Sequence, residues 1–276
     1  MDIKVRKYNE SDKDALQSYE LSDKQQIYSS LPLDVLNEAL EDKDRTANVV
    51  VTDDGKVVGF FVLHKHYQHE GYDTPHEVVY VRSLSINEKY QGNGYGTKVA
   101  QLLPVYVQEN FSQFEHLYLV VDGENQGAWN LYERAGFLHT ATKEEGPIGK
   151  ERLYYLDLDR NYVPNLRINL ASDVSASTLK FNLMLGEEVA GYIDTVKNGK
   201  VLEIKHIYVE EKHRSKGIAE SAIRQFATIV RKYLKDVEIA EVNVTNTGLE
   251  KLFTGAGFVH PHDAEDENYY RKLVRY

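Results

Sequence analysis

Three glycines within five residues, Gly92, Gly94 and Gly96, are the part of the sequence whose spacing most directly suggests chemistry. They follow the apolar run "VVYVRSLSI" and precede an amphipathic run, so we expect a strand, a glycine turn and a helix. Glycine allows positive φ angles and close backbone approach. The free N–H groups and the dipole of a helix start attract an anion. The stretch therefore predicts an anion site without identifying the anion.

Both this turn and a second segment recur later in the chain. "QGNGYG" from Gln91 has a counterpart, "RSKGIA", that begins at Arg214, and "NQGAWNLYERAGF" from Asn125 has a counterpart, "NTGLEKLFTGAGF", that begins at Asn246. The two offsets are nearly equal, and the predicted strands and helices recur in the same order. We interpret the chain as an internal duplication of two α/β domains, residues 1–160 and 161–276.

Three kinds of phosphate-binding turn can be compared with the first stretch. A dinucleotide fold requires G-x-G-x-x-G directly after the first strand of a βαβ unit, whereas Gly92, Gly94 and Gly96 follow about the fourth expected strand. A P-loop ends in Gly-Lys-Ser/Thr, whereas "GYGTK" has its Lys and Thr in reverse order. The third pattern, Q/R-x-x-G-x-G/A, fits both copies.

This third pattern resembles the pyrophosphate loop of the GNAT superfamily of N-acetyltransferases. In that family the loop is followed by a helix, a strand and N-x-x-A-x-x-x-Y-x-x-x-G-F. Here Asn125, Ala128, Tyr132, Gly136 and Phe137 keep that spacing. The resemblance implies two tandem GNAT-like α/β (α+β) domains, each a mixed, mostly antiparallel twisted sheet flanked by helices.

The resemblance also implies acetyl-coenzyme A (CoA) as a co-substrate and assigns residues to it. Backbone N–H groups of the turn would hold the pyrophosphate, the preceding strand would run beside the pantetheine arm, and Asn125 would contact that arm. The residues implied in cofactor binding are Leu84, Ser85, Ile86, Gln91, Gly92, Asn93, Gly94, Tyr95, Gly96, Thr97 and Asn125.

Tyr132 is the predicted catalytic residue, because a phenol can protonate the CoA thiolate as it leaves. The alternative is that Tyr132 only packs its helix. The general base stays open: family members often carry Glu or Asp where this chain has Arg82 or Ser83. Glu77 and two histidines, His64 and His66, are the candidates.

Four histidines, His64, His66, His69 and His76, surround the end of the third expected strand. His64 and His66 would share a strand face and could bind a metal. We favour a polar loop that lines the acceptor site, and we predict no metal. The early helices, with Tyr19 and Tyr28, would form the other acceptor wall.

These early helices give two local expectations. Ser11 is the expected N-cap of the first helix, with Asp14 three residues on. In "LPLDVLNEALED", Leu33, Leu36 and Leu40 would form one apolar face.

Composition narrows the class of protein. There is no cysteine, which excludes disulfides and thiolate chemistry, and no apolar run of membrane-spanning length. Residues 1–160 carry the whole net charge of −10, which disfavours nucleic acid and favours a cationic acceptor such as a polyamine or amino sugar. We expect a cytoplasmic protein, monomeric or homodimeric, without nucleic-acid or membrane partners.

The second domain has Phe253 where the first has Tyr132, so it keeps an aromatic ring but lacks the proton donor. We interpret it as a shortened, degenerate and mainly structural copy. The predicted function is acetyl-CoA-dependent N-acetyltransfer to a primary amine of a small acceptor, directly in a ternary complex. The alternative is a non-catalytic acyl-CoA-binding or sensing protein.

Overall fold

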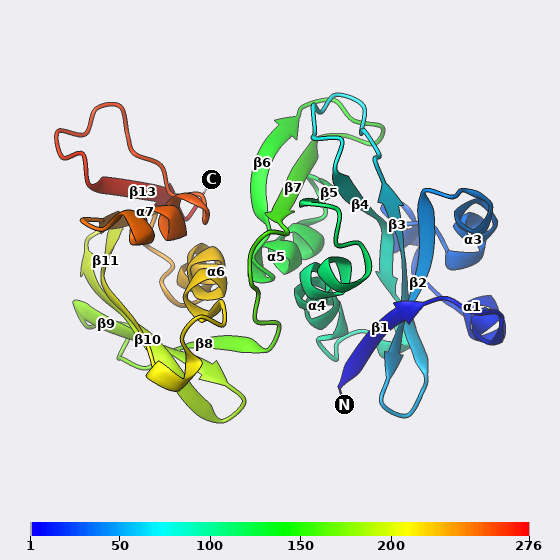
Figure 1. Ribbon diagram of the computed structural model, residues 1–276, viewed down its shortest axis with the longest axis horizontal. Helices are drawn as coiled ribbons and strands as arrows, with labels where there is room; N and C mark the ends of the chain where they lie inside the picture. Colours follow the sequence, from blue (N-terminus) through cyan, green and yellow to red (C-terminus); the bar gives the residue numbers. More distant parts are fainter. Residues whose placement is uncertain (1, 276) are drawn as a thin grey trace. The chain divides into compact units, whose positions relative to one another are not determined.

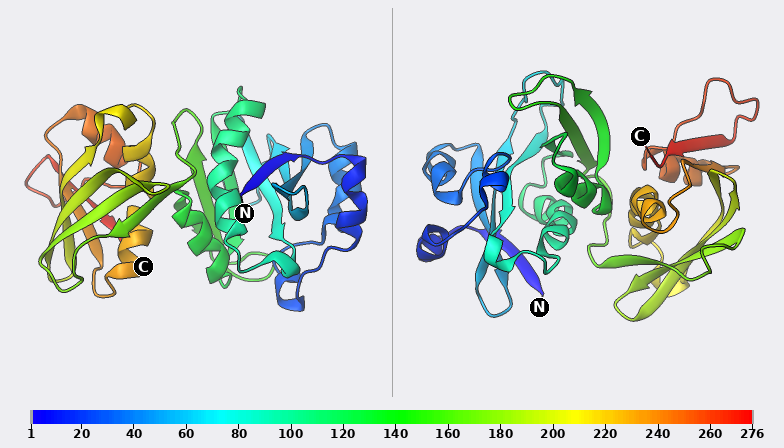
Figure 2. Two further views of the ribbon diagram at one scale, coloured as in Figure 1. Left: turned by 90° about the horizontal axis from the view of Figure 1, so that it is seen from below. Right: turned by 180° about the vertical axis from the view of Figure 1, so that it is seen from behind.

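A computed structural model describes residues 2–275, and the chain divides into two compact units, Met1–Asp159 and Arg160–Tyr276 (Figure 1). Each unit has its own mixed sheet with helices against it (Figure 2). The expected fold class is therefore confirmed. Among residues 2–275, no helix combines the length and the apolarity needed to cross a bilayer.

The first unit contains a seven-stranded sheet in the order β1-β2-β3-β4-β5-β7-β6. Its strands are β1 (Ile3–Lys7), β2 (Arg45–Thr52), β3 (Val57–Lys65), β4 (Val78–Ile86), β5 (His116–Asp122), β6 (Leu138–Lys143) and β7 (Glu151–Asp157). Its helices are η1 (Glu10–Asp12), α1 (Lys13–Gln17), α2 (Asp23–Gln26), α3 (Pro32–Glu41), η2 (Glu88–Tyr90), α4 (Tyr95–Asn110) and α5 (Gln126–Arg134). Only β4 and β5 pair in parallel.

Helices cover both faces of this sheet: α4 and α5 lie on one face, and α1 and α3 on the other (Figure 1). β5 shows how the sheet buries its residues by alternation. Leu117, Leu119 and Val121 are all buried, while their neighbours along the strand are half-exposed. On the other face, Leu16 and Leu36 of the early helices join a buried cluster with residues of β2 and β3. The sheet thus lies between two layers of helices.

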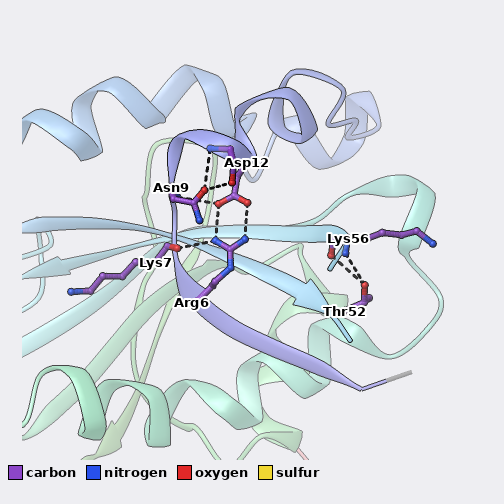
Figure 3. A network of polar contacts seen from close by, with 7 residues as sticks. Arg6, Lys7, Asn9, Asp12, Thr52 and Lys56 are labelled. Carbon is purple, nitrogen blue, oxygen red and sulfur yellow. Dashed lines mark hydrogen bonds and ion pairs between the residues drawn. The ribbon is translucent and has the colours of Figure 1, made fainter. Parts of the chain in front are cut away.

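The start of the first helical segment differs from the sequence expectation. Asn9, not Ser11, is the N-cap, and its partner in the capping box is Asp12. Asp12 is buried and also receives two hydrogen bonds of 2.7 Å from the Arg6 guanidinium, as Figure 3 shows. A buried carboxylate needs such partners, so the Arg6 contact selects the earlier start and lowers the pKa of Asp12.

The apolar face expected on α3 was also partly wrong. Leu36 is buried, but Leu33 and Leu40 are exposed, and Pro32 and Ala39 are buried in their place. The buried stripe is therefore rotated around the helix axis and is formed by Pro32, Leu36 and Ala39. A spacing rule based only on leucines could not detect this.

The second unit contains a six-stranded sheet in the order β13-β12-β11-β10-β9-β8. Its strands are β8 (Leu166–Leu170), β9 (Thr178–Leu185), β10 (Glu188–Asn198), β11 (Val201–Val209), β12 (Ile239–Asn243) and β13 (Tyr269–Leu273). Its helices are η3 (Glu211–His213), α6 (Ile218–Tyr233) and α7 (Thr247–Thr254). Again only one pair, β11 with β12, is parallel.

The second unit repeats the central part of the first: β11, α6, β12 and α7 follow the order of β4, α4, β5 and α5. Within residues 160–275 no helix corresponds to α1–α3, as expected. Two strands were not expected from the sequence, β6 and β8. β6 has only one buried residue, Leu138, and so carries no strong apolar pattern. β8 does alternate, with Leu166 and Ile168 buried, but it is an edge strand of only five residues.

Candidate active site

The site begins where β4 and β5 separate. Their parallel ladder covers only Val78–Tyr80 and His116–Tyr118, although both strands continue further. Just beyond the ladder, β4 has a bulge at Ser83, whose φ of 51° is unusual for a residue with a side chain. Beyond Tyr80 and Tyr118 the described residues of the two strands form no ladder with each other, so their facing edges can pair with another molecule.

A cavity of about 830 Å³ lies at this opening. Its wall includes the ends of β4 and β5, the glycine turn, and the starts of α4 and α5. All of the predicted site residues except Asn93 line this cavity, namely Leu84, Ser85, Ile86, Gln91, Gly92, Gly94, Tyr95, Gly96, Thr97, Asn125 and Tyr132. Asn93 instead donates to the carbonyl of Tyr90 at 2.9 Å, which braces the turn.

Glycine occupies the three positions of the turn for different structural reasons. Gly92 and Gly94 have φ angles of 79° and 75°, and no other atom lies within 4 Å of where a Cβ would be. Gly96 has a packing reason, since a Cβ there would lie 2.8 Å from a methyl of Leu131 on α5. The turn at Gly92 and Gly94 is therefore open, and Gly96 lets the two helices approach.

The first residue of the pattern, Gln91, ties the turn to the strand that precedes it. Its amide nitrogen donates to the carbonyl of Ile86 at 2.7 Å. In the second unit Arg214 makes the equivalent bond, from Nε to the carbonyl of Val209, at 3.0 Å. Both side chains thus fix the distance between strand end and helix start, which explains why Gln and Arg can replace one another.

The start of α4 suits an anion. Its N-cap is Gly94, no acidic residue lies in its first turn, and Thr97 adds a hydroxyl to the wall. The free N–H groups of a first helical turn carry about half a positive charge. Together with the open space at Gly92 and Gly94, this arrangement can hold a diphosphate.

Tyr132 lies on α5 and is 7% exposed, with its ring packed edge to face against Phe137 at 5.5 Å. Burial raises the pKa of the Tyr132 phenol, because the charged phenolate is poorly solvated there. The group therefore stays protonated at neutral pH while lining the cavity. Tyr132 therefore packs its helix and also forms part of the cavity wall.

Asn125 has a structural role as well as a place in the wall. It is the N-cap of α5, and its side-chain oxygen accepts a hydrogen bond from the N–H of Ala128 at 3.2 Å. This bond orients the start of α5, the helix that carries Tyr132.

The candidate bases do not line the cavity: His64, His66 and Glu77 are all outside its wall. His64 lies 3.2 Å from the Arg82 guanidinium, and burial lowers the pKa of the His64 imidazole. His64 and His66 also fail to share a face, which corrects the expectation. His66 lies beyond the end of β3 with a φ of 59°, and its ring stacks on His76.

The other members of the histidine group, His69 and His76, also lie outside the cavity wall. His69 lies 3.5 Å from the buried carboxylate of Glu151, and burial lowers the pKa of its imidazole. Across residues 2–275 there is no group of three or more His, Asp or Glu side chains arranged for a metal ion. Of the two expected wall tyrosines, Tyr28 lines the cavity, and Tyr19 lies beneath it with its hydroxyl 3.0 Å from that of Ser85.

Sequence reasoning missed Asp122, the last residue of β5. It lines the cavity, and one carboxylate oxygen accepts from the N–H of Glu124 at 2.9 Å. The other oxygen is buried and has no hydrogen-bond partner among residues 2–275. The sequence could have indicated Asp122, because the duplication aligns it with Asn243. The negative charge at this position is therefore specific to the first copy.

Comparison with known proteins identifies the class. A sequence model described as the acetyltransferase (GNAT) family matches residues 13–137 and 151–258. The chain therefore belongs to this family and contains two copies of its unit, which confirms the resemblance found from the glycine turn and "LYERAGF".

One curated relative is an uncharacterized N-acetyltransferase, YbbJ, from Bacillus subtilis (strain 168). It is 32% identical over 155 residues, which is 56% of this chain and 96% of that protein. Among solved structures, an aminoglycoside acetyltransferase AAC(6')-Ib with coenzyme A is 19% identical with a TM-score of 0.47, over 56% of this chain and 95% of that one. A spermidine N-acetyltransferase from Vibrio cholerae with CoA and spermine is 18% identical with a TM-score of 0.42, over 57% and 96%.

Proposed function

We propose that this protein is an N-acetyltransferase that moves an acetyl group from acetyl-CoA to a primary amine of a small acceptor. The observation that carries the proposal is the coexistence, in one cavity, of an open anion-binding turn, a splayed strand pair and the buried phenol of Tyr132. The first unit is the proposed catalytic unit, and the second is a shortened structural copy with Phe253 in place of the phenol.

In this proposal the turn from Gln91 to Thr97 holds the diphosphate, and the free edge of β4 from Leu84 to Ile86 runs beside the pantetheine arm. A β4 N–H polarises the thioester carbonyl. The neutral amine attacks that carbonyl in a ternary complex, the N–C bond forms and the C–S bond breaks. Tyr132 donates its proton to the departing thiolate and is reprotonated by the proton that the acylated nitrogen releases. The donor role rests on the place of Tyr132 in the cavity wall, where its phenol is protonated at neutral pH.

The acceptor we propose is cationic. Asp122 and Glu124 are carboxylates in the cavity wall, where Lys24 is the basic side chain. A buried carboxylate oxygen without a partner, as at Asp122, is costly and is satisfied well by a substrate ammonium group. The acidic balance of the first unit acts in the same direction at longer range.

The decisive experiment follows CoA thiol release with acetyl-CoA and a panel of polyamines, amino sugars, amino acids and peptides. We expect turnover with at least one small amine, and we expect Tyr132→Phe to lower kcat by at least about tenfold, as for loss of a general acid. Circular dichroism of the variant checks that the fold is unchanged.

Two outcomes would reject parts of this proposal. If acetyl-CoA binds but no acceptor is turned over, the non-catalytic binding or sensing alternative is favoured. If turnover occurs and Tyr132→Phe leaves kcat unchanged, the role of Tyr132 is wrong, although the transferase function stands.

A further inference from the structure

The second unit repeats the backbone of the glycine turn closely. Ser215 and Gly217 have φ angles of 59° and 80°, against 79° and 75° for Gly92 and Gly94. Gly217 is the N-cap of α6, as Gly94 is of α4. The two turns therefore present the same arrangement of backbone to whatever lies beside them.

What lies beside the two turns is different. A Cβ added to Gly94 would have no other atom within 4 Å. A Cβ added to Gly217 would lie 2.3 Å from the carbonyl oxygen of Asn161 and 2.7 Å from its carbonyl carbon. The second turn is thus in direct contact with the backbone of the segment that opens the second unit.

This segment, Arg160–Val163, is fastened along the first two turns of α6. The N–H of Val163 donates to the hydroxyl of the buried Ser221 at 2.9 Å, and the Arg160 guanidinium lies 3.4 Å from the Glu220 carboxylate. The guanidinium of Arg224 lies 5.5 Å from the ring centre of Tyr162. Consecutive residues of the segment thus have separate partners on one helix.

The charged groups at the start of α6 all have partners within the second unit or repel an anion. Glu220 places a carboxylate in the first turn of α6, where α4 has no acidic residue. A carboxylate and a carbonyl oxygen satisfy the positive end of a helix and repel an incoming phosphate. Two loop cations that would favour a phosphate, Arg214 and Lys216, donate to the carbonyls of Val209 and Lys212.

We infer that Arg160–Val163 permanently occupies the second turn, so that the duplicated anion site serves as the attachment point for the unit's own opening segment. The protein consequently binds one CoA per chain, in the first unit. This inference rests on the proposed function for its CoA readout, but the contact between Asn161 and Gly217 stands independently of it.

The unmodified protein gives the first test. Calorimetric titration with CoA is expected to show one site per chain. Hydrogen exchange is expected to slow in residues 92–97 on CoA addition and to stay unchanged in residues 215–221. Two equivalents of CoA, or protection of both turns, would overturn the inference.

A matched pair of variants gives the second test. Gly94→Ala is expected to weaken CoA binding by about tenfold or more, through lost charge-assisted bonds to the diphosphate, and its φ strain alone is expected to lower Tm by about 2–4 °C. Gly217→Ala has the same φ strain but also collides with Asn161, so we expect the larger fall in Tm, about 5 °C or more, faster exchange in α6, and CoA affinity within about twofold of the original protein.

The outcomes separate the two proposals. If Gly217→Ala weakens CoA binding as Gly94→Ala does, or leaves exchange in α6 unchanged, the segment is not a fixed occupant. If Gly217→Ala fails to fold, the titration and exchange of the unmodified protein decide. If no CoA binds at all, the proposed function fails, while the difference in stability between the two glycine variants still tests the contact at Gly217.

Discussion

The two units place the same aromatic pair at the same point and differ there by one oxygen atom. In the first unit the rings of Tyr132 and Phe137 lie 5.5 Å apart at 69°, and in the second those of Phe253 and Phe258 lie 5.2 Å apart at 79°. In both, the backbone N–H of the second aromatic residue donates to the carbonyl of the first at 3.0 Å. Packing of the short helix therefore requires the ring, and the hydroxyl of Tyr132 is additional to it.

The same distinction holds at the end of the parallel strand. Asp122 and Asn243 both end the strand that precedes the helix, but only Asp122 carries a charge. The glycine turns likewise share their backbone and differ in what lies against them. At these three places the duplication preserved the backbone and the ring, and the differences lie in groups that would contact a cofactor or an acceptor.

The largest expected effect comes from exchanging the two aromatic residues. In a Tyr132→Phe background, we expect Phe253→Tyr to restore no activity, so that kcat stays at least about tenfold below that of the unmodified protein. The reason is that the second turn is covered, and a hydroxyl at position 253 has no acetyl-CoA to protonate. Thiol release with the preferred amine measures this.

The single variant Phe253→Tyr is the control, with unchanged kcat expected. It also buries a hydroxyl at a site that is 2% exposed, so we expect it to cost stability of about 1–3 kcal/mol if the hydroxyl finds no partner. Recovery of most of the activity in the double variant would place catalysis in the second unit.

The second substitution, at the end of β5, gives the first unit the residue type that the second unit has at the end of β12. Asp122→Asn keeps the shape of the side chain but removes its charge. We expect kcat/KM for a cationic amine to fall by about tenfold, since a bond to a charged group contributes on the order of 1.5–3 kcal/mol. CoA affinity should stay within about twofold.

Glu124→Gln is the matched control, because Glu124 lines the cavity wall but is exposed, and solvent screens its charge. We expect a change below about threefold there. Equal effects at both positions would indicate general electrostatic attraction, and no effect at Asp122 would remove it from the acceptor site.

How far the sequence could predict this site depends on whether each feature is local. The turn from Gln91 to Thr97 was predictable, because strand, glycines and helix are adjacent in the chain and their geometry follows from residue type. Tyr132 was predictable through the spacing of its motif. The turn and the place of Tyr132 can therefore each be predicted from a segment shorter than about 15 residues.

Features that depend on distant contacts were not predictable in this way. Asn161 lies 56 positions from Gly217, and only the folded chain brings its carbonyl against the turn. The pairing of His64 with His66 failed because a single backbone angle at His66 ended the strand alternation. The burial of Pro32 and Ala39 on α3 depended on the shape of the sheet that the helix contacts.

The smallest expected effect comes from substitution of Ser83, in the bulge of β4. Ser83 has a φ of 51°, whereas His206, its counterpart on β11, has an ordinary negative φ. A β-branched residue is strained at positive φ, so we expect Ser83→Val to destabilise the first unit by about 1–2 kcal/mol and to lower kcat/KM, while Ser83→Gly and His206→Val change stability by less than about 0.5 kcal/mol. Urea unfolding, with hydrogen exchange to assign each unit, measures this. If Ser83→Val is as stable as Ser83→Gly, the positive φ at Ser83 carries no strain, and since β11 also has a register shift, at Lys205, the strand opening does not distinguish the two units.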